Sequence, residues 1–242
     1  MVYGNIQNIL IALLKRLPAN KIKSDNQWQQ LFKDAAVKIE NARETIIQEH
    51  FTEASISAKV ADFLPAKTTL ITGNSMSIRD LACFSNGTKA KTFHQRGLAG
   101  IDGLISGAAG TASLLEEPVF LLLGDISAFH DINGLALLQH IKKPVIIIII
   151  NNFGGRIFEQ LPLGRIDKFK ESLATGFIAT QTISFEQIAL SFKIKYQKVT
   201  TALELGSAIS ASLNFTKPGI IEAEIDIQNT EGWRDKFCNY LN

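Results

Sequence analysis

The sequence has few of the residues that form disulfide frameworks or thiolate metal sites. Its two cysteines, Cys83 and Cys238, lie far apart, and no CxxC pair occurs. Two free thiols in a reducing compartment are the simplest interpretation, so we expect a cytoplasmic protein. The four histidines form no cluster with the cysteines, and zinc is therefore not indicated.

Three further absences exclude whole classes of protein. No segment reaches the roughly 18–20 uncharged apolar residues of a membrane span, and the apolar stretch near the start ends at Lys15 and Arg16. The net charge is only +2, without a basic stripe interleaved with aromatics, so we expect no nucleic-acid partner. Neither the GxxxxGK[ST] nor the GxGxxG phosphate-binding pattern is present.

What the sequence does contain is a regular alternation of strand-like and helix-like segments from about residue 51 onward. The predicted strands are 68–73, 91–94, 119–125, 145–152, 193–199 and 219–226. The run "VIIIII" has strand length and no polar face, which is typical of a parallel sheet covered on both sides. We predict a doubly wound α/β domain with a mostly parallel six-stranded sheet and helices on both faces.

Residues 1–50 differ from the rest of the chain. They hold a short apolar run followed by a helical stretch rich in Lys, Gln and Asn, and they carry no catalytic pattern. We interpret 1–50 as a linker or the tail of a preceding domain, and 51–242 as the main domain.

Polar clusters follow four of the predicted strands. They are "GNS" at 73–75, "HQRG" at 94–97, "GDIS" at 124–127 and "NNFGG" at 151–155. Ligands of doubly wound sheets bind beyond the carboxyl ends of the strands, so these clusters are expected at one edge.

Asp125 and Asn152 end two strands that are separated by a single helical crossover. A carboxylate, an amide oxygen and a backbone carbonyl in the turn that contains Gly154 form a hard-oxygen set with open coordination positions. That set suits Mg²⁺ bound to phosphates. Alternatively, Asp125 caps the next helix and the asparagines merely turn a loop. The combination with the glycines favours the metal–diphosphate site.

Longer stretches carry a resemblance to a known family. Gly124-Asp125, 25 intervening residues and Asn151-Asn152 resemble the metal signature of thiamine-diphosphate enzymes, although Ile126 stands where that signature has glycine. The segments "TGNSMSIRDL", "QRGLAGIDGLISGAAG", "GDISAFHDINGLALL" and "INNFGGRIFEQLP" resemble, in order and spacing, the C-terminal domain of the 2-succinyl-5-enolpyruvyl-6-hydroxy-3-cyclohexene-1-carboxylate synthases (the MenD family) of menaquinone biosynthesis. The resemblance covers about residues 51–242.

The resemblance implies thiamine diphosphate as cofactor, with Mg²⁺ or alternatively Mn²⁺. It assigns metal binding to Asp125, Asn152 and the Gly154 carbonyl. It also implies a set of cofactor-binding residues, in which Ile101 would support the bent cofactor beneath its thiazolium and Ser127 would lie beside the diphosphate. That set is Asn74, Ile101, Gly124 and Ser127.

The resemblance further implies a synthase that decarboxylates 2-oxoglutarate and adds the succinyl unit to isochorismate. Arg79 and Arg96 would bind the substrate carboxylates, since guanidinium groups grip carboxylates in a fork. Ile157 and Phe158 would line an apolar wall. Surface ion pairs for the arginines, and a plain core role for the two apolar residues, remain alternatives.

The members of this family also have a central domain and a pyrimidine-binding domain, whose glutamate ionises the cofactor. By the resemblance, residues 1–50 match the end of a truncated central domain, and we expect no certain catalytic residue in this chain. We therefore expect this chain to need a pyrimidine-binding domain from another chain, to be inactive alone and to form a homo-oligomer. We also expect it to expose an apolar patch near Ile101, Ile157 and Phe158. Another thiamine-diphosphate decarboxylase or lyase, or a non-catalytic subunit, is the alternative.

Overall fold

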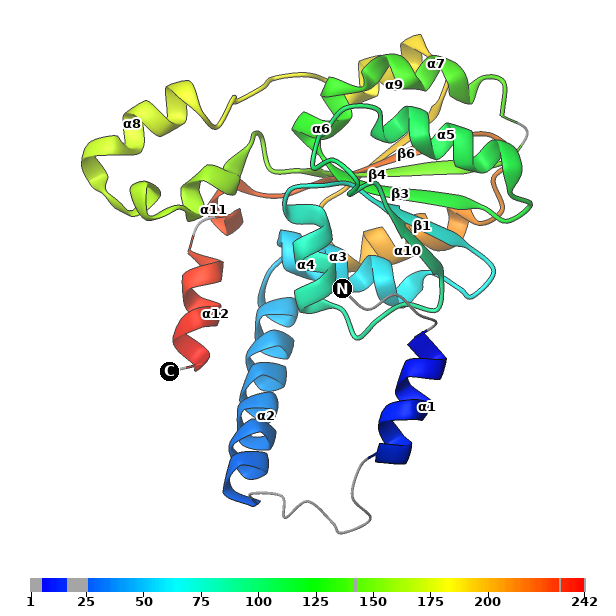
Figure 1. Ribbon diagram of the computed structural model, residues 1–242. Coiled ribbons are helices and arrows are strands. Elements are labelled where there is room, and N and C mark those ends of the chain that lie inside the picture. The colour runs from blue at the N-terminus through cyan, green and yellow to red at the C-terminus, as the bar shows by residue number, and fades with distance from the viewer. Residues whose placement is uncertain (1–5, 17–25, 142, 231, 242) are drawn as a thin grey trace.

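The computed structural model describes residues 6–16, 26–141, 143–230 and 232–241, and it contains a six-stranded sheet in which every pairing is parallel (Figure 1). The strand order is β2-β1-β3-β4-β6-β5. The strands are β1 Thr69–Thr72, β2 Lys91–His94, β3 Val119–Gly124, β4 Val145–Asn151, β5 Lys195–Val199 and β6 Gly219–Glu224. The predicted fold class is confirmed.

The central strand β4 shows why the sheet must be covered on both faces. All seven of its residues are buried. Ile146, Ile148 and Ile150 belong to one hydrophobic cluster, whereas Ile147 and Ile149 belong to a second cluster on the opposite face. Side chains of a strand alternate between faces, so an unbroken apolar run requires an apolar layer on each side.

Helices form these two layers (Figure 1). One face packs against α3 Glu53–Phe63, α4 Met76–Phe84 and α10 Ala202–Ser212. The other face packs against α5 Leu104–Leu114, α6 Asp125–His130, α7 Leu135–Leu138 and α9 Phe185–Ser191, with the 3₁₀ turn η1 at Ile132–Gly134 between α6 and α7. The result is the three-layer arrangement typical of doubly wound domains.

The remaining elements lie outside these layers. They are α1 Ile6–Arg16, α2 Asn26–Glu49, the 3₁₀ turns η2 Arg156–Gln160 and η3 Pro162–Arg165, α8 Asp167–Gly176, α11 Ile227–Thr230 and α12 Trp233–Leu241. The last turns of α2 pack beside α12 through a small apolar cluster that includes Ile46, Phe84 and Trp233. The C-terminal helix α12 therefore lies beside α2 below the sheet, whereas α1 lies apart from both (Figure 1).

The segment 1–50 was interpreted as a linker and domain tail. Its residues 1–5 and 17–25 lie outside the described part of the chain, and the rest forms α1 and α2. Most of α2 is exposed, and its buried residues are Ala42, Arg43 and Ile46 near the C-terminal end. The origin of this segment in a second domain stays a prediction. Within the described ranges, no helix combines the length and apolarity needed to cross a bilayer.

Candidate functional site

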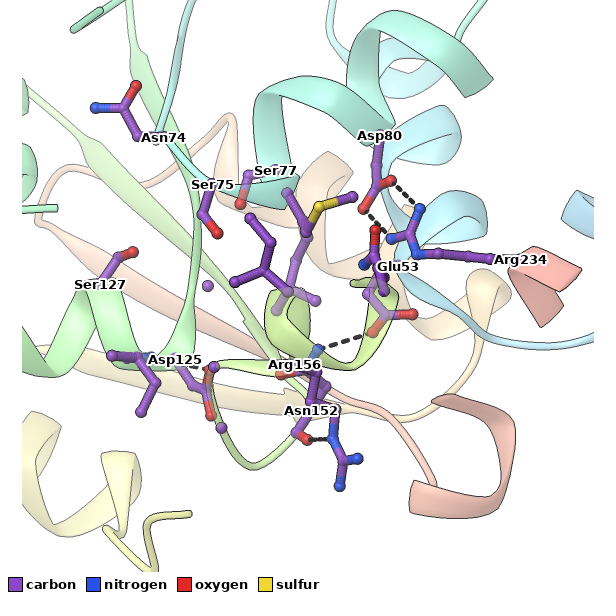
Figure 2. Close-up of a pocket in the computed structure, with 18 residues that line it drawn as sticks. Glu53, Asn74, Ser75, Ser77, Asp80, Asp125, Ser127, Asn152, Arg156 and Arg234 are labelled. Atoms are coloured by element: carbon purple, nitrogen blue, oxygen red, sulfur yellow. Dashed lines mark hydrogen bonds and ion pairs between the residues drawn. The ribbon is translucent and has the colours of Figure 1, made fainter. Parts of the chain in front are cut away.

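The carboxyl ends of β1, β3 and β4 surround one pocket, as the strand-end clusters predicted (Figure 2). Asn74 and Ser75 follow β1, Asp125 and Ser127 follow β3, and Asn152 follows β4. Because β3 pairs directly with both β1 and β4, the residues after these strands come together without any long-range rearrangement. The pocket is the point where the predicted donors meet.

Asp125 is the carboxylate that follows β3 in this pocket, and only 2% of it is exposed. Its Oδ1 accepts the backbone N–H of Ile126 at 2.9 Å, and its Oδ2 accepts the side-chain amide of Gln181 at 3.1 Å. Burial raises the pKa of Asp125 to about 6, against the opposing effect of these hydrogen bonds. The group is held in place by neutral donors, and a cation would relieve the cost of its burial.

Asn152 has one end of its amide fixed by a second carboxylate. Its Nδ2 donates to Glu53 Oε1 at 2.8 Å, and Glu53 Oε2 accepts the indole N–H of Trp233 at 2.9 Å. The Asn152 backbone carbonyl accepts Arg156 Nε at 2.7 Å. With the nitrogen committed to Glu53, the amide oxygen is the atom that Asn152 offers to a ligand.

The preceding asparagine has a different role. Asn151 is buried, and its Nδ2 donates to Glu222 Oε1 at 2.6 Å, while Glu222 Oε2 accepts the Tyr196 hydroxyl at 2.7 Å. Asn151 Oδ1 accepts the backbone N–H of Phe153 at 3.1 Å. Asn151 therefore shapes the turn after β4 rather than facing the pocket.

That turn has an unusual backbone. Phe153 has φ 61° and Gly154 has φ 147°. A Cβ on Gly154 would lie 2.7 Å from both the carbonyl oxygen and the Cγ2 of Ile178, so only glycine fits. The Gly154 carbonyl accepts the Arg156 N–H at 3.0 Å, and a carbonyl oxygen has a second lone pair for another partner.

Asn74 supplies a buried polar atom that lacks a protein partner. Its Nδ2 donates to the backbone carbonyls of Gln95 and Gly100, whereas its Oδ1 is fully buried with no hydrogen bond. Such an atom costs free energy unless a ligand or water satisfies it. Its neighbour Ser75 has φ 65°, a strained conformation that is concentrated at functional sites.

Four predicted residues, Arg79, Arg96, Ile101 and Phe158, do not line this pocket. Arg79 is exposed and donates to the Ser75 carbonyl, Arg96 is exposed after β2, and Ile101 is partly buried before α5. Ile157 does line the pocket. Phe158 is 36% exposed, and its ring packs edge-on against Phe177 at 5.5 Å between centroids.

Several pocket residues were missed by sequence reasoning. Asp80 on α4 is buried and accepts both Nη atoms of Arg234 at 2.7 and 2.8 Å (Figure 2). Desolvation raises the pKa of Asp80, against the opposing effect of Arg234. Glu53 is the third missed residue, and Figure 2 shows it with Asp80 and Arg234 on the side of the pocket away from Ser127. For Glu53 the only local signal was its place in the acidic first turn of α3, which is too common a feature to identify a site.

The donor chemistry of the pocket fits a hard cation bound to a phosphate ligand. Among the described residues there is no group of three or more His, Cys, Asp or Glu side chains that could hold a metal ion. One carboxylate, one oriented amide oxygen and one turn carbonyl are available instead. Such a set leaves positions for water and diphosphate oxygens, as Mg²⁺ prefers.

Comparison with protein families decides the relationship. Residues 74–223 match the family described as "Thiamine pyrophosphate enzyme, C-terminal TPP binding domain". The chain belongs to this family. The predicted cofactor, thiamine diphosphate, is thereby confirmed at the level of the family, and the matched range includes the carboxyl ends of β3 and β4.

Two relatives carry the name 2-succinyl-5-enolpyruvyl-6-hydroxy-3-cyclohexene-1-carboxylate synthase. The one from Sorangium cellulosum is 34% identical over 235 residues, which are 93% of this chain and 38% of the relative. The one from Oceanobacillus iheyensis is 39% identical over 190 residues, which are 77% of this chain and 32% of the relative. The resemblance to the MenD synthases is confirmed, and the chain spans only 38% and 32% of the length of these two relatives.

Solved structures support the fold. A thiamine diphosphate-dependent 4-hydroxybenzoylformate decarboxylase from Rhodococcus jostii RHA1 is 21% identical, with a TM-score of 0.57 over 73% of this chain and 33% of that one. A benzoylformate decarboxylase from Polynucleobacter necessarius is 17% identical, with a TM-score of 0.58 over 72% and 33%. At these identities, the likeness concerns the fold of this thiamine pyrophosphate domain alone.

Proposed function

We propose that this chain is the diphosphate- and metal-binding part of a thiamine-diphosphate-dependent synthase, which decarboxylates 2-oxoglutarate and adds the succinyl unit to isochorismate. The observation that carries the proposal is the placement of Asp125 and Asn152 at adjacent strand ends around one pocket. The similarity to synthases of this name, at 34% and 39% identity, supports the choice of reaction.

In this proposal, three oxygen donors hold Mg²⁺, with Mn²⁺ as an alternative. They are the Asp125 carboxylate, the Asn152 amide oxygen and the Gly154 carbonyl. Gly124 and Ser127 lie beside the diphosphate, and the unsatisfied Oδ1 of buried Asn74 accepts a hydrogen bond from the cofactor. Once bound and ionised, thiamine diphosphate supplies the carbanion chemistry.

The same proposal assigns substrate binding to the exposed rim of the pocket. Arg79 and Arg96 would bind substrate carboxylates, and their exposure leaves both guanidinium groups accessible. Ile101 would support the thiazolium, while Ile157 and Phe158 would line the apolar wall. Exposure alone also fits surface ion pairs, so the assignment rests on the resemblance and on the charge of the substrates.

A second domain is required to complete the site. We propose that residues 51–242 form the diphosphate-binding domain and that 1–50 are a linker and the tail of a central domain. The group that ionises the cofactor would come from a pyrimidine-binding domain, on another chain of a homo-oligomer or on a separate fragment. Proton abstraction needs a positioned base within hydrogen-bond reach, and no residue here is assigned that role.

Calorimetric titration of thiamine diphosphate in the presence of Mg²⁺ tests the proposal. The wild-type chain should bind the cofactor only when Mg²⁺ is present, and Asp125→Ala should abolish this Mg²⁺-dependent binding while leaving the fold intact. Asp62→Ala removes an exposed carboxylate at the far end of α3 and serves as the matched control. Equal cofactor binding by wild type and Asp125→Ala would remove the site assignment.

A further inference from the structure

The two asparagines after β4 are each held by a different glutamate. Glu222 on β6 accepts the Asn151 amide, and Glu53 on α3 accepts the Asn152 amide. The second oxygen of each carboxylate accepts one further donor, the Tyr196 hydroxyl at Glu222 and the Trp233 indole at Glu53. The two arrangements are chemically parallel, but only Asn152 lines the pocket.

We propose that Glu53, itself held by Trp233, is a positioning residue that turns the Asn152 amide oxygen toward the bound metal. The inference rests on the proposed function. Glu53 and Trp233 both lie outside residues 74–223, the range matched by the family, so they extend the site beyond the cofactor-binding domain as the family describes it.

The orientation follows from the donors and acceptors that are present. An indole N–H can only donate, and a carboxylate can only accept. With Trp233 on Oε2, the remaining oxygen of Glu53 accepts from Asn152, and only the Nδ2 of that amide can donate to it. The opposite amide orientation would place Asn152 Oδ1 against a carboxylate oxygen. Glu53 thus selects one of two otherwise similar rotamers.

The start of α12 is fixed firmly enough to serve this role. Trp233 is 5% exposed and packs edge-on against Phe84 at 5.3 Å. The next residue, Arg234, forms a bidentate ion pair with buried Asp80, and its guanidinium stacks on the Trp233 ring at 4.0 Å. Bidentate pairing fixes direction as well as distance. The indole is therefore a rigid donor.

Glu53→Gln and Glu222→Gln make the same chemical change in the two parallel arrangements. In Glu53→Gln, the introduced NH₂ faces either the Trp233 N–H or the Asn152 NH₂, and both of these groups are donors. The Asn152 amide should therefore reverse, so that its oxygen accepts from the introduced NH₂ and its own NH₂ faces the metal. In Glu222→Gln, the Tyr196 hydroxyl can rotate and accept from the new NH₂. We expect Glu53→Gln to weaken Mn²⁺ binding by about 10–100-fold, as for other groups that orient metal ligands. Glu222→Gln should weaken it by less than about threefold.

The double variant Glu53→Gln/Trp233→Phe supplies a rescue. Removing the indole N–H frees one side of the introduced glutamine, whose NH₂ can then point away while its oxygen accepts from Asn152. Most of the lost affinity should return, although a buried hydrogen bond has been deleted. If Glu53→Gln merely damaged the fold, the second substitution would lower the Mn²⁺ affinity further instead of restoring it.

Electron paramagnetic resonance of Mn²⁺, titrated into the full chain with thiamine diphosphate, measures these affinities without any need for turnover. Circular dichroism identifies a variant that fails to fold, and in that case Trp233→Phe alone should still weaken Mn²⁺ binding measurably. Two results would overturn the positioning role alone, provided that the wild type binds Mn²⁺. One is an equal loss of Mn²⁺ affinity in Glu53→Gln and Glu222→Gln, and the other is a double variant that recovers no affinity. Absence of Mn²⁺ binding by the wild type overturns the proposed function and this inference with it.

Discussion

Gln181 donates its side-chain amide to Asp125 Oδ2 at 3.1 Å, although the two residues are 56 positions apart in the sequence. Gln181 lies between α8 and α9, and its Oε1 in turn accepts the backbone N–H of Ile183. Gln181 thus gives Asp125 Oδ2 a neutral hydrogen-bond donor, which stabilises the carboxylate less than a cation would. The buried carboxylate is tolerated by the fold, yet it destabilises the chain without metal.

Asp125→Asn should therefore stabilise the metal-free chain at neutral pH. Burial raises the pKa of Asp125 from 3.8 to about 6, so the folded state binds the proton more tightly than the unfolded state. Stability contributed by the protonated group is present below about pH 4 and is lost as the pH rises through about 6. This difference in pKa corresponds to about 3 kcal/mol of unfolding free energy at most. Weaker hydrogen bonds to the introduced asparagine should offset part of this gain.

Urea unfolding in EDTA, at pH 7 and at pH 4.5, measures this effect. The free energy of unfolding of Asp125→Asn should exceed that of the wild type at pH 7, and the gain should shrink at pH 4.5. A gain of the same size at both pH values would show that ionisation of Asp125 is not its source.

Gly154→Ala should destabilise the chain more than Gly87→Ala. Both glycines have positive φ, 147° and 86°. A Cβ on Gly154 would lie 2.7 Å from the Ile178 carbonyl oxygen, whereas a Cβ on Gly87 would meet nothing within 4 Å. Gly87→Ala carries the conformational cost alone, about 1–2 kcal/mol. Gly154→Ala should exceed it by about 1 kcal/mol or more in urea unfolding, and equal losses would contradict the steric argument.

Arg79→Ala and Arg96→Ala should impair catalysis after the chain is combined with its missing domain. A buried carboxylate that loses its charged partner costs on the order of 2–4 kcal/mol in transition-state binding. Steady-state kinetics with 2-oxoglutarate and isochorismate measure the loss as a change in kcat/KM. Lys91→Ala, which removes an exposed cation of β2 that pairs with Glu117, is the control. Unchanged kinetics in both arginine variants would remove their substrate role.

The isolated chain should bind cofactor weakly, self-associate and show no synthase activity. The strand-end rim, with Phe158 partly exposed, would lack its covering domain, and uncovered apolar surface drives association. Adding a separately expressed pyrimidine-binding domain should restore some turnover. Light scattering follows the association, and decarboxylation of 2-oxoglutarate follows the activity. Robust decarboxylation by the purified chain alone would show that a residue of this chain, such as His94 or His130, activates the cofactor.

The amino-acid sequence by itself determined the sheet and the place where its polar ends meet. The uninterrupted run of five isoleucines has to be covered on both faces, and such strands are parallel. Parallel strands that neighbour each other bring their carboxyl ends to one edge, so the sequence alone places Asp125 near Asn152. These features depend on periodicity and chain direction, and both are local properties.

Only the tertiary structure decided which side chains orient that pair. Asn152 meets Glu53 across 99 positions, and Glu53 meets Trp233 across 180. No sequence pattern links these residues, because each contact depends on how α3 and α12 pack and on the rotamers that result. A buried amide has one correct orientation out of two, and the carboxylate that selects it is held by an indole that lies far away in the sequence.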